Sequence, residues 1–502
     1  MNTQARTVAR IALGIGLALY LVFGIGRALT NMPWCDEAWF ASSSVNLVRH
    51  GFIGNTLMID AGGPLESIKD HTYWQPPLYF LAEALVFKTF GVGLFQARLL
   101  SVFFGLIGLI AVFYICRKTS LQSPVMSLLV VVLVAVDYFY LNIASDARMD
   151  MMSASLAFLA LAMYFCLRER NFSIALLISN TLVCLSGLSH PNGILGLIML
   201  WGLIIFLDRR RLGTRYVLVC LVPYIIGAIG WGLYIAQDFH AFKSQFFANM
   251  FRPESEVYVN GLKWAAIRQE ILERYLYPFG LYPGRTSVVP LFKLPILGFF
   301  FLNAILGPFY FKRKEQKTQL LLLCLCFFGL MFVIANKSPS YLVWITPLFI
   351  INCVAVWQQL KLRKFIRLLY NLAFVYVLLV SISGQFRIIS MDQYRNKYLH
   401  DIVNFDQKYY QGDSIYGSGE LAFYYNFDDT VIKDDRKLGW VTGRKAKYLV
   451  LSPVVSQSLE RLKQQSEDAA KYIRNLFDSE YELLYEGRYY TFYERTGNKS
   501  RM

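Results

Sequence analysis

Residues 11–40 read IALGIGLALYLVFGIGRALT followed by NMPWCDEAWF. The first part is almost wholly apolar and has about the 20 residues that a helix needs to cross a hydrocarbon core of about 30 Å. The second part holds the acidic pair Asp36-Glu37 among aromatic and apolar neighbours. A carboxylate at a membrane boundary is costly to bury unless it is paired, solvated or functional. The stretch therefore predicts a membrane span that leads directly into a candidate functional site.

The composition extends this prediction to most of the chain. Of its 502 residues, 56% are hydrophobic and only 17% are charged, whereas roughly a quarter are charged in soluble proteins. The apolar residues fall into blocks of about 20, which indicates a mainly α-helical, polytopic membrane protein with about eleven transmembrane helices. The predicted spans are 9–30, 97–116, 124–143, 150–167, 172–189, 191–207, 216–237, 290–310, 318–335, 340–358 and 365–385.

The net charge of +16 comes largely from short basic clusters between the apolar blocks. Cytoplasmic loops carry such clusters, so they indicate membrane topology rather than nucleic-acid binding. They share the cytoplasmic side only if Pro76–Gly93 does not cross the membrane. We therefore expect an inside N-terminus, an outside C-terminus and an outer loop 31–96 with interfacial helices near Glu37–Arg49 and Pro77–Phe90. The clusters are Arg117-Lys118, Arg168/Arg170, Arg209-Arg210-Arg211 with Arg215, Lys312-Arg313-Lys314 with Lys317, and Lys361/Arg363/Lys364/Arg367.

The chain divides by composition into two parts. Residues 1–390 form the predicted transmembrane domain, and residues 391–502 form a small extracytoplasmic α/β domain. The predicted elements of the second domain are strands at 413–417 and 447–451, a helix at 459–476 and a hairpin at 483–493.

The predicted outer face gathers most of the acids and bases that the positive-inside rule leaves unexplained. Each candidate also has a structural explanation. Acids in the first turn of a helix favour its dipole by about 0.3–1 kcal/mol, a local ion pair would account for acids on both sides of an arginine, and a histidine before a proline is often structural. A lysine can simply border a turn. The candidates are Asp36, Glu37, Tyr73, Gln75, Arg98, Asp146, Arg148, Asp150, His190, Lys337 and Tyr341.

The candidates stand in an ordered set of short motifs from about residue 8 to residue 360. These are Asp36-Glu37, Tyr73-Trp74-Gln75-Pro76-Pro77-Leu78-Tyr79, Arg98, Asp146-Ala147-Arg148-Met149-Asp150, Gly187-Leu188-Ser189-His190-Pro191 and Asn336-Lys337-Ser338-Pro339-Ser340-Tyr341. This order resembles the GT-C superfamily of glycosyltransferases, in particular the protein O-mannosyltransferases and the bacterial lipid A aminoarabinose transferases. The resemblance implies a GT-C fold and a polyprenyl-phosphate-linked sugar donor.

The resemblance also implies roles for single residues. Asp36 matches the acid of the first outer loop that lies at the catalytic centre, and Glu37 completes the pair. Asp150 matches a further acid of the second outer loop. Lys337 and Tyr341 match a motif that helps bind the donor phosphate.

One position departs from the family pattern. Aminoarabinose transferases have a phosphate-contacting lysine just before the first-loop proline, whereas this chain has Gln75. This difference favours a more general polyprenyl-phosphate-sugar transferase. From the chemistry, we expect Arg98 and His190 to stabilise charge on the departing phosphate, with Tyr73, Asp146 and Arg148 as further site candidates.

The sequence thus predicts an inverting glycosyltransferase of a cell membrane, either a bacterial inner membrane or a plasma membrane, with an extracytoplasmic active site. Its partners would be the lipid-linked donor and a lipid, glycan or protein acceptor, which the outer loop 239–289 would help bind. No cofactor is predicted with certainty, and two outer acids could hold a divalent ion. A transporter or flippase of lipid-linked sugars is the alternative, but transporters usually place ionisable groups near the midplane of repeated halves. The eight cysteines show neither a disulfide framework nor metal-ligand spacing.

Overall fold

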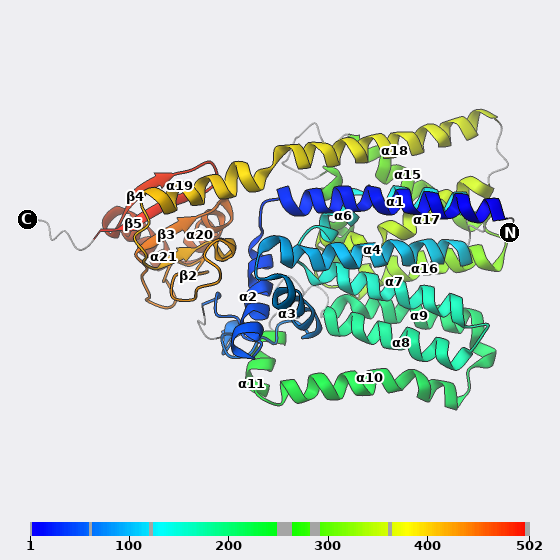
Figure 1. Ribbon diagram of the computed structural model, residues 1–502, viewed down its shortest axis with the longest axis horizontal. Coiled ribbons are helices and arrows are strands. Elements are labelled where there is room, and N and C mark those ends of the chain that lie inside the picture. The colour runs from blue at the N-terminus through cyan, green and yellow to red at the C-terminus, as the bar shows by residue number, and fades with distance from the viewer. Residues whose placement is uncertain are drawn as a thin grey trace, which may run out of the picture.

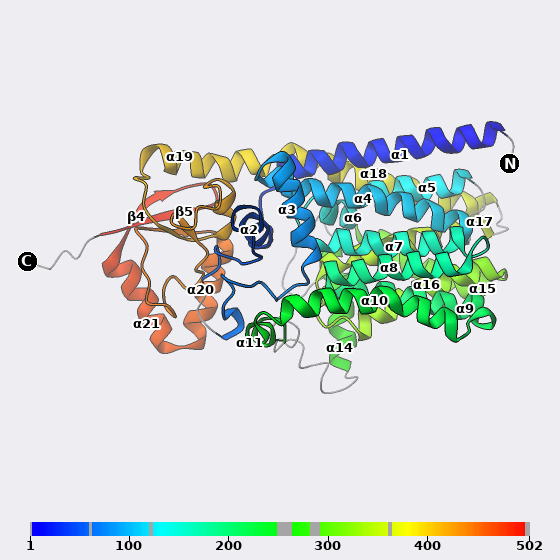
Figure 2. The ribbon, with the colours of Figure 1, turned by 60° about the horizontal axis from the view of Figure 1, so that its bottom comes forward.

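A computed structural model describes residues 3–59, 63–119, 124–247, 264–281, 292–359 and 364–496. Long helices run roughly side by side in a bundle, with the N-terminus at one end and a small mixed sheet beyond the other (Figures 1 and 2). The long helices are α1 (Thr3–Thr30), α4 (Leu94–Lys118), α5 (Pro124–Ala135), α6 (Tyr138–Ala144), α7 (Met149–Leu167), α8 (Phe172–Ser189), α9 (Ile194–Asp208), α10 (Thr214–Ile235), α15 (Leu294–Tyr310), α16 (Lys314–Phe332), α17 (Thr346–Gln359) and α18 (Lys364–Met391).

The described residues hold a helix at each of the eleven predicted spans. Eight helices are long and apolar enough to cross a membrane, and the pair α5 and α6 would make a ninth span. The remaining two positions hold the shorter helices α15 and α17. The multi-pass helical fold is therefore confirmed, although two predicted spans are less regular than expected.

The first irregular span is the predicted helix 124–143, which is broken. Helices α5 and α6 meet at an angle of 62°, and the Asp137 side chain caps the second helix by accepting a hydrogen bond from the Tyr140 N–H at 2.9 Å. An aspartate at this position competes with a continuous helix, because it satisfies the N–H groups of a new helix start. The second is 340–358, which begins as a 3₁₀ helix, Pro339–Trp344, before α17.

The outer helices of the bundle keep apolar side chains on their exposed faces. In α10, Leu218, Ile226 and Leu233 are 59%, 65% and 69% exposed, and only two residues of that helix are buried. A helix that is apolar all round is typical of a membrane span. These faces are therefore suited to lipid contact.

Two helices lie between the bundle and the sheet, where the interfacial helices were predicted (Figures 1 and 2). They are α2 (Cys35–His50) and α3 (Leu78–Phe90). Phe40 of α2 packs against Trp74, and against Tyr79 and Phe80 of α3. Helix α2 ends at Gly51, whose φ of +80° is a left-handed conformation that favours glycine.

The C-terminal part is a small α/β unit. Its five-stranded sheet has the order β2-β1-β3-β5-β4, with parallel β2-β1-β3 pairs and antiparallel β3-β5-β4 pairs. The two predicted strands and the predicted hairpin are confirmed. The predicted helix 459–476 is instead two helices, since Ser466 caps the second by accepting a hydrogen bond from the Ala469 N–H. The elements are α19 (His400–Lys408), β1 (Ile415–Gly417), β2 (Ile432–Lys433), β3 (Tyr448–Leu451), α20 (Pro453–Gln465), α21 (Glu467–Asn475), β4 (Tyr481–Glu486) and β5 (Thr491–Arg495).

The segment between α1 and α4 contacts this unit directly. Met58 forms an isolated parallel bridge with Asp434, and the Asp434 N–H donates to the Leu57 carbonyl at 2.9 Å. The Trp39 indole N–H donates to the Asp434 carboxylate at 2.7 Å. These contacts place the start of α2 against the C-terminal part of the chain.

Candidate functional site

Asp36 and Glu37 occupy the first turn of α2, but their surroundings differ. Glu37 Oε2 accepts a hydrogen bond from the Trp34 N–H at 2.8 Å, which is a helix-capping contact. The Glu37 side chain is fully buried, whereas 26% of the Asp36 side chain is exposed. The capping explanation therefore applies to Glu37, and Asp36 stays accessible.

Glu37 and Arg98 form a buried bidentate ion pair. Arg98 Nε and Nη2 donate to the two carboxylate oxygens at 2.7 Å each. The other Arg98 N–H groups donate to the carbonyls of Ala28, Asn31 and Met32 at 2.9–3.0 Å. A guanidinium has five N–H donors, and all five of them are used here. Arg98, predicted to contact the donor phosphate, thus has no donor left for a ligand in this structure.

Asp36 is held instead by Arg148, which lies just before α7. Arg148 Nη1 lies 2.6 Å from Asp36 Oδ2, and Arg148 Nε lies 3.0 Å from Asp150 Oδ2. Burial disfavours the charge on Arg148, but Asp150 and Asp36 outweigh it, so the pKa of Arg148 lies well above its ordinary value. The arginine therefore stays positive and brings together Asp36 and Asp150, two of the three acids that were predicted to be catalytic.

His190 lies beside this group as a neutral imidazole. Its Nδ1 accepts a hydrogen bond from the Asn192 N–H at 3.0 Å, which leaves the ring proton on Nε2. Burial lowers the pKa of His190, with the Asp150 carboxylate opposing that effect. Nε2 lies 3.9 Å from Asp150 Oδ1, an oxygen without a hydrogen-bond partner among the described residues. His190 is therefore suited to donate a hydrogen bond rather than to supply a full positive charge.

The side chains of Asp36, Arg148, Asp150 and His190 form a row, and Tyr341 lies next to His190 at its end. The centres of the two rings are 5.9 Å apart, and the Arg274 guanidinium lies 5.8 Å from the Tyr341 ring on another side. Tyr341 thereby connects the group around Asp36 with a second cluster of charges.

The second cluster contains Lys337, Glu270 and Arg274. Lys337 Nζ lies 2.9 Å from Glu270 Oε2 and donates to the carbonyls of Met331 and Ile334 at 2.8 Å, near the end of α16. Arg274 Nη1 lies 2.6 Å from Glu270 Oε1. Burial lowers the pKa of Lys337, and an ion pair opposes such a shift. Lys337, which is 5% exposed, holds the turn in place here and does not face an open site.

The three remaining predicted site residues are more loosely related to this row. Asp146 lies near Glu37, and burial together with that carboxylate raises its pKa to about 6. The Tyr73 hydroxyl donates to the Tyr234 carbonyl at 3.1 Å, so this tyrosine packs against α10. Gln75 has a buried Oε1 without a hydrogen-bond partner among the described residues. The structure does not bring Tyr73 into contact with Asp36.

Two buried acids were not singled out from the sequence as site residues. Glu270 binds both cations of the second cluster, as described above. Glu83 of α3 accepts hydrogen bonds from Ser44 Oγ at 2.7 Å and from the Tyr79 hydroxyl at 3.2 Å. Neither residue stands in a recognisable motif, so nothing in the sequence indicated that either carboxyl belongs near the site.

A divalent ion has no evident place between the predicted catalytic acids. The Arg148 guanidinium already lies between Asp36 and Asp150, and a second cation there would be repelled. In the part of the chain that the structure describes, no three His, Cys, Asp or Glu side chains form a group able to hold a metal.

No protein-family model matches the chain, and no curated protein matches it by sequence. Its fold, however, matches solved structures over most of their length. ArnT from Cupriavidus metallidurans bound to undecaprenyl phosphate superposes with a TM-score of 0.61 at 15% identity, covering 98% of this chain and 99% of that one. The apo state of the same protein superposes with a TM-score of 0.59 at 15% identity, covering 98% of each chain. A third structure is the archaeal oligosaccharyltransferase AglB from Archaeoglobus fulgidus in complex with an inhibitory peptide and a dolichol-phosphate. It superposes with a TM-score of 0.56 at 12% identity, covering 100% of this chain and 75% of that one.

This chain has the GT-C fold. The fold predicted from the order of short motifs is thereby confirmed. Because the match to ArnT covers nearly all of both chains, the GT-C likeness includes the C-terminal α/β unit as well as the helical bundle.

Proposed function

We propose that this protein transfers a sugar from a polyprenyl-phosphate-linked donor to a hydroxyl or phosphate of a lipid, glycan or protein acceptor. The observation that carries the proposal is Asp36, a partly exposed carboxylate at the end of the bundle, oriented by Arg148. The GT-C fold supports it, because one structure with that fold contains undecaprenyl phosphate and another contains a dolichol-phosphate.

The residues suit a single displacement. Asp36 takes the proton of the acceptor hydroxyl while the acceptor oxygen forms a bond to the anomeric carbon of the sugar. The bond between that carbon and the phosphate oxygen breaks, and polyprenyl phosphate leaves with the electron pair. Attack from the side opposite the phosphate inverts the anomeric centre. A general base of this kind typically contributes about 10²–10⁴-fold to the rate.

Positive charge for the leaving phosphate comes, in our proposal, from Arg148. Its side chain is 18% exposed and contacts both acids, whereas Arg98 is fully buried and fully hydrogen-bonded. A preorganised cation lowers the barrier most when it lies where negative charge develops in the transition state. Tyr341 and His190 can donate hydrogen bonds beside it, and Lys337 keeps the Tyr341 turn in position.

The basic clusters support an extracytoplasmic position for the active site. Arg168 and Arg211 both contact Asp208, at 2.7 Å and 3.3 Å, at the end of α9 remote from the sheet (Figures 1 and 2). Basic residues in short loops favour the cytoplasmic side. The end of the bundle that holds Asp36 and the C-terminal unit would then be extracytoplasmic.

The test is the variant Asp36→Asn, expressed in the native host in place of the wild-type gene. We expect the variant to fold and to reach the membrane, but the mass spectrum of intact envelope lipids and glycans should lack the sugar that the wild-type gene adds. Glu460→Gln, an exposed acid on α20, serves as the matched control and should restore the modification. Normal sugar addition by Asp36→Asn would remove Asp36 from the role of base.

A further inference from the structure

A pocket of about 590 Å³ lies between the chain that follows α2 and the C-terminal unit. We call it the basic pocket, because its charged lining residues are the cations Lys69, Lys433 and Arg444 and the single acid Asp429. One water molecule takes up about 30 Å³ in the liquid, so the pocket admits a ligand of several non-hydrogen atoms. None of its lining residues belongs to the row of side chains around Asp36.

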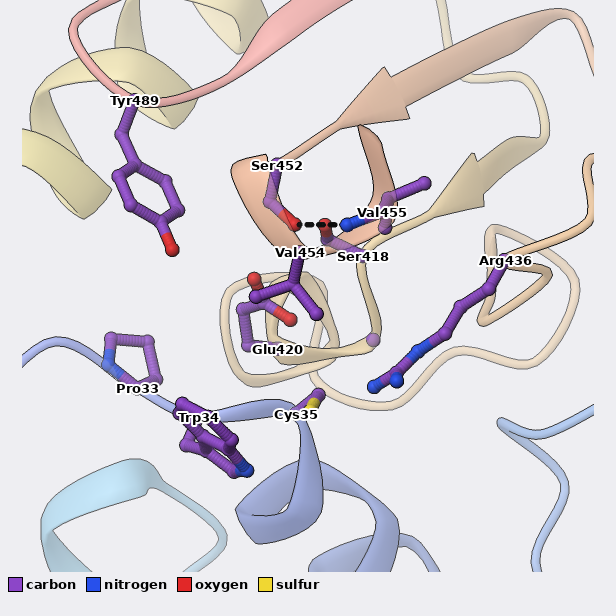
Figure 3. Close-up of a pocket in the computed structure, with 11 residues that line it drawn as sticks. Pro33, Trp34, Cys35, Ser418, Glu420, Arg436, Ser452, Val454, Val455 and Tyr489 are labelled. Atoms are coloured by element: carbon purple, nitrogen blue, oxygen red, sulfur yellow. Dashed lines mark hydrogen bonds between the residues drawn. The ribbon is translucent and has the colours of Figure 1, made fainter. Parts of the chain in front are cut away.

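The same junction contains a smaller pocket, which Figure 3 shows in close-up. Arg436 reaches toward Cys35 there, and Ser418 and Glu420 lie nearby. Its free space is about that of one water molecule, so its polar groups need no larger ligand. The basic pocket is therefore the better candidate for a ligand site.

Strand β2 and the residue that follows it have side chains on two sides of this junction. Successive side chains of a strand point to opposite faces. Asp434 accepts the hydrogen bond from the Trp39 indole, whereas Lys433 Nζ donates to the Thr56 carbonyl at 2.6 Å. An ammonium group has three donors, so this contact fixes Lys433 in the pocket wall and leaves donors for a ligand.

The other two cations come from separate parts of the chain. Lys69 is held beside the Thr56 segment by backbone pairing, since the Asn55 N–H donates to the Ile68 carbonyl at 2.7 Å. Arg444 lies in the chain just before β3. The outer loop thus supplies one cation of the basic pocket, and the C-terminal unit supplies two.

The protein does not neutralise these charges itself. Within the described ranges, Lys69, Lys433 and Arg444 form no ion pair with a carboxylate. Burial lowers the pKa of Lys433, while Asp429 opposes that effect and Arg444 adds to it. Three cations and one acid leave the lining with a net charge of +2. A concave site lined mainly by one sign of charge attracts ions of the opposite sign.

A phosphate group matches this lining better than a carboxylate does. It carries about −1.5 to −2 charges at pH 7 and has three strong acceptor oxygens, whereas a carboxylate carries one charge. Arginine binds phosphate through two parallel N–H donors, and lysine binds it as a point charge. The side chains of Met58 and Ile59, which also line the pocket, provide apolar contact for carbon atoms attached to the phosphate.

We propose that the basic pocket binds a phosphate group and that the bound group fastens the outer loop to the C-terminal unit. A ligand that contacts Lys69 on one side and Lys433 and Arg444 on the other stabilises the contact between the two parts. The proposal does not depend on the proposed function, because the pocket shares no residue with the catalytic row. Inorganic phosphate and a phospholipid head group offer the same chemistry, and the test separates them.

The test uses the full-length protein in a maltoside detergent that is free of phosphate and phospholipid. One arm measures binding of radiolabelled inorganic phosphate by equilibrium dialysis at constant ionic strength. The other arm measures binding of phosphatidic acid by native mass spectrometry. We expect the wild type to bind in at least one arm, and its melting temperature to rise with that ligand. Binding in one arm alone identifies the source of the phosphate group.

Two variants of exposed residues should change binding in opposite directions. Arg444→Gln loses a charge-assisted hydrogen bond and should weaken binding about 10-fold or more. Asp429→Asn removes the only acid of the lining and should tighten binding about 2- to 5-fold. Opposite effects of two surface substitutions reflect charge in the pocket rather than a loss of folded protein.

Arg461→Gln is the matched control, because Arg461 is an exposed arginine on α20 that does not line the basic pocket. It should bind the ligand as the wild type does. The proposal is overturned if the wild type binds in neither arm. It is also overturned if Arg444→Gln binds as tightly as the wild type, or if Asp429→Asn binds more weakly, because the phosphate would then be bound elsewhere.

Discussion

At the scale of single residues, the acidic pair separates into two roles. Glu37 is fully buried and bound to Arg98, while Asp36 is partly exposed and bound to Arg148. The sequence predicted Asp36 as the base and Glu37 as a neighbour that orients it, but it did not identify the partner of either residue. The reason is that their partners lie 61 and 112 positions away along the chain. Local pattern carries no information about such partners.

Glu83 provides a prediction at the same scale. Burial raises its pKa to about 8, although Ser44 and Tyr79 donate hydrogen bonds to it. A carboxyl with a raised pKa in the folded state stabilises the fold fully below its unfolded pKa and loses that contribution as the pH rises through about 8. The variant Glu83→Gln should therefore match the wild type near pH 5 and have the higher melting temperature above pH 8. The gain is at most about 5 kcal/mol.

Thermal unfolding of the purified protein between pH 5 and pH 9 measures this difference. Glu66→Gln is the control, because Glu66 is an acid in the same outer loop that is 40% exposed. Its melting temperature should follow that of the wild type at every pH. A Glu83→Gln curve parallel to the wild-type curve would mean that Glu83 is ionised in the folded protein.

At the scale of elements, the Glu37–Arg98 pair holds four segments together. Arg98 of α4 binds the end of α1, the chain that follows it and Glu37 of α2. Glu37 also accepts a hydrogen bond from the Ala147 N–H at 2.7 Å, which fixes the turn before α7. This pair therefore positions the loop that carries Arg148 and Asp150 relative to Asp36.

Removal of one partner of this pair should be strongly destabilising. Glu37→Gln leaves the Arg98 charge buried without a counter-charge, and breaking a buried pair in this way costs about 3–5 kcal/mol. We expect a clear loss of folded protein in denaturant unfolding. Asp36→Asn, which alters a partly exposed pair, should cost no more than about 1 kcal/mol. Equal stability of the two variants would contradict the assigned roles.

The elements themselves were predicted well where hydrophobic patterning decides them. The membrane spans are recognisable by the length of their apolar runs. The two helices of the outer loop and the C-terminal hairpin are recognisable by the period of their apolar residues. The breaks were missed at Asp137 and Ser466, because each is a single polar residue that caps a new helix start inside an apolar or helical run. A capping side chain and a solvent-facing side chain look alike in a sequence.

At the scale of the whole molecule, the topology can be tested independently of the chemistry. The bundle places the N-terminus and the C-terminal sheet at opposite ends (Figure 1). A reporter inserted after Gly93, between α3 and α4, should therefore be extracytoplasmic, as should a reporter at the C-terminus. A reporter at the N-terminus is the control and should be cytoplasmic. A cytoplasmic signal after Gly93 would show that α3 crosses the membrane and would reverse the side of every later loop.

The fold class and the order of the membrane helices were predictable from the sequence because membrane spans and ordered motifs are both local signals. The contact between α2 and the C-terminal unit was not predictable. It joins Trp39 to Asp434, which lies 395 positions further along the chain. A contact between two distant parts of the chain becomes visible only when the folded protein is known.

The most direct test of the central claim is donor cleavage by the purified protein. The protein in nanodiscs would be incubated with a panel of polyprenyl-phosphate sugars, without any membrane gradient, and released polyprenyl phosphate would be measured by mass spectrometry. The account predicts release by the wild type from at least one donor and a loss of about 10²–10⁴-fold in Asp36→Asn. Release at the same rate by Asp36→Asn, or no release by the wild type from any donor, would contradict it.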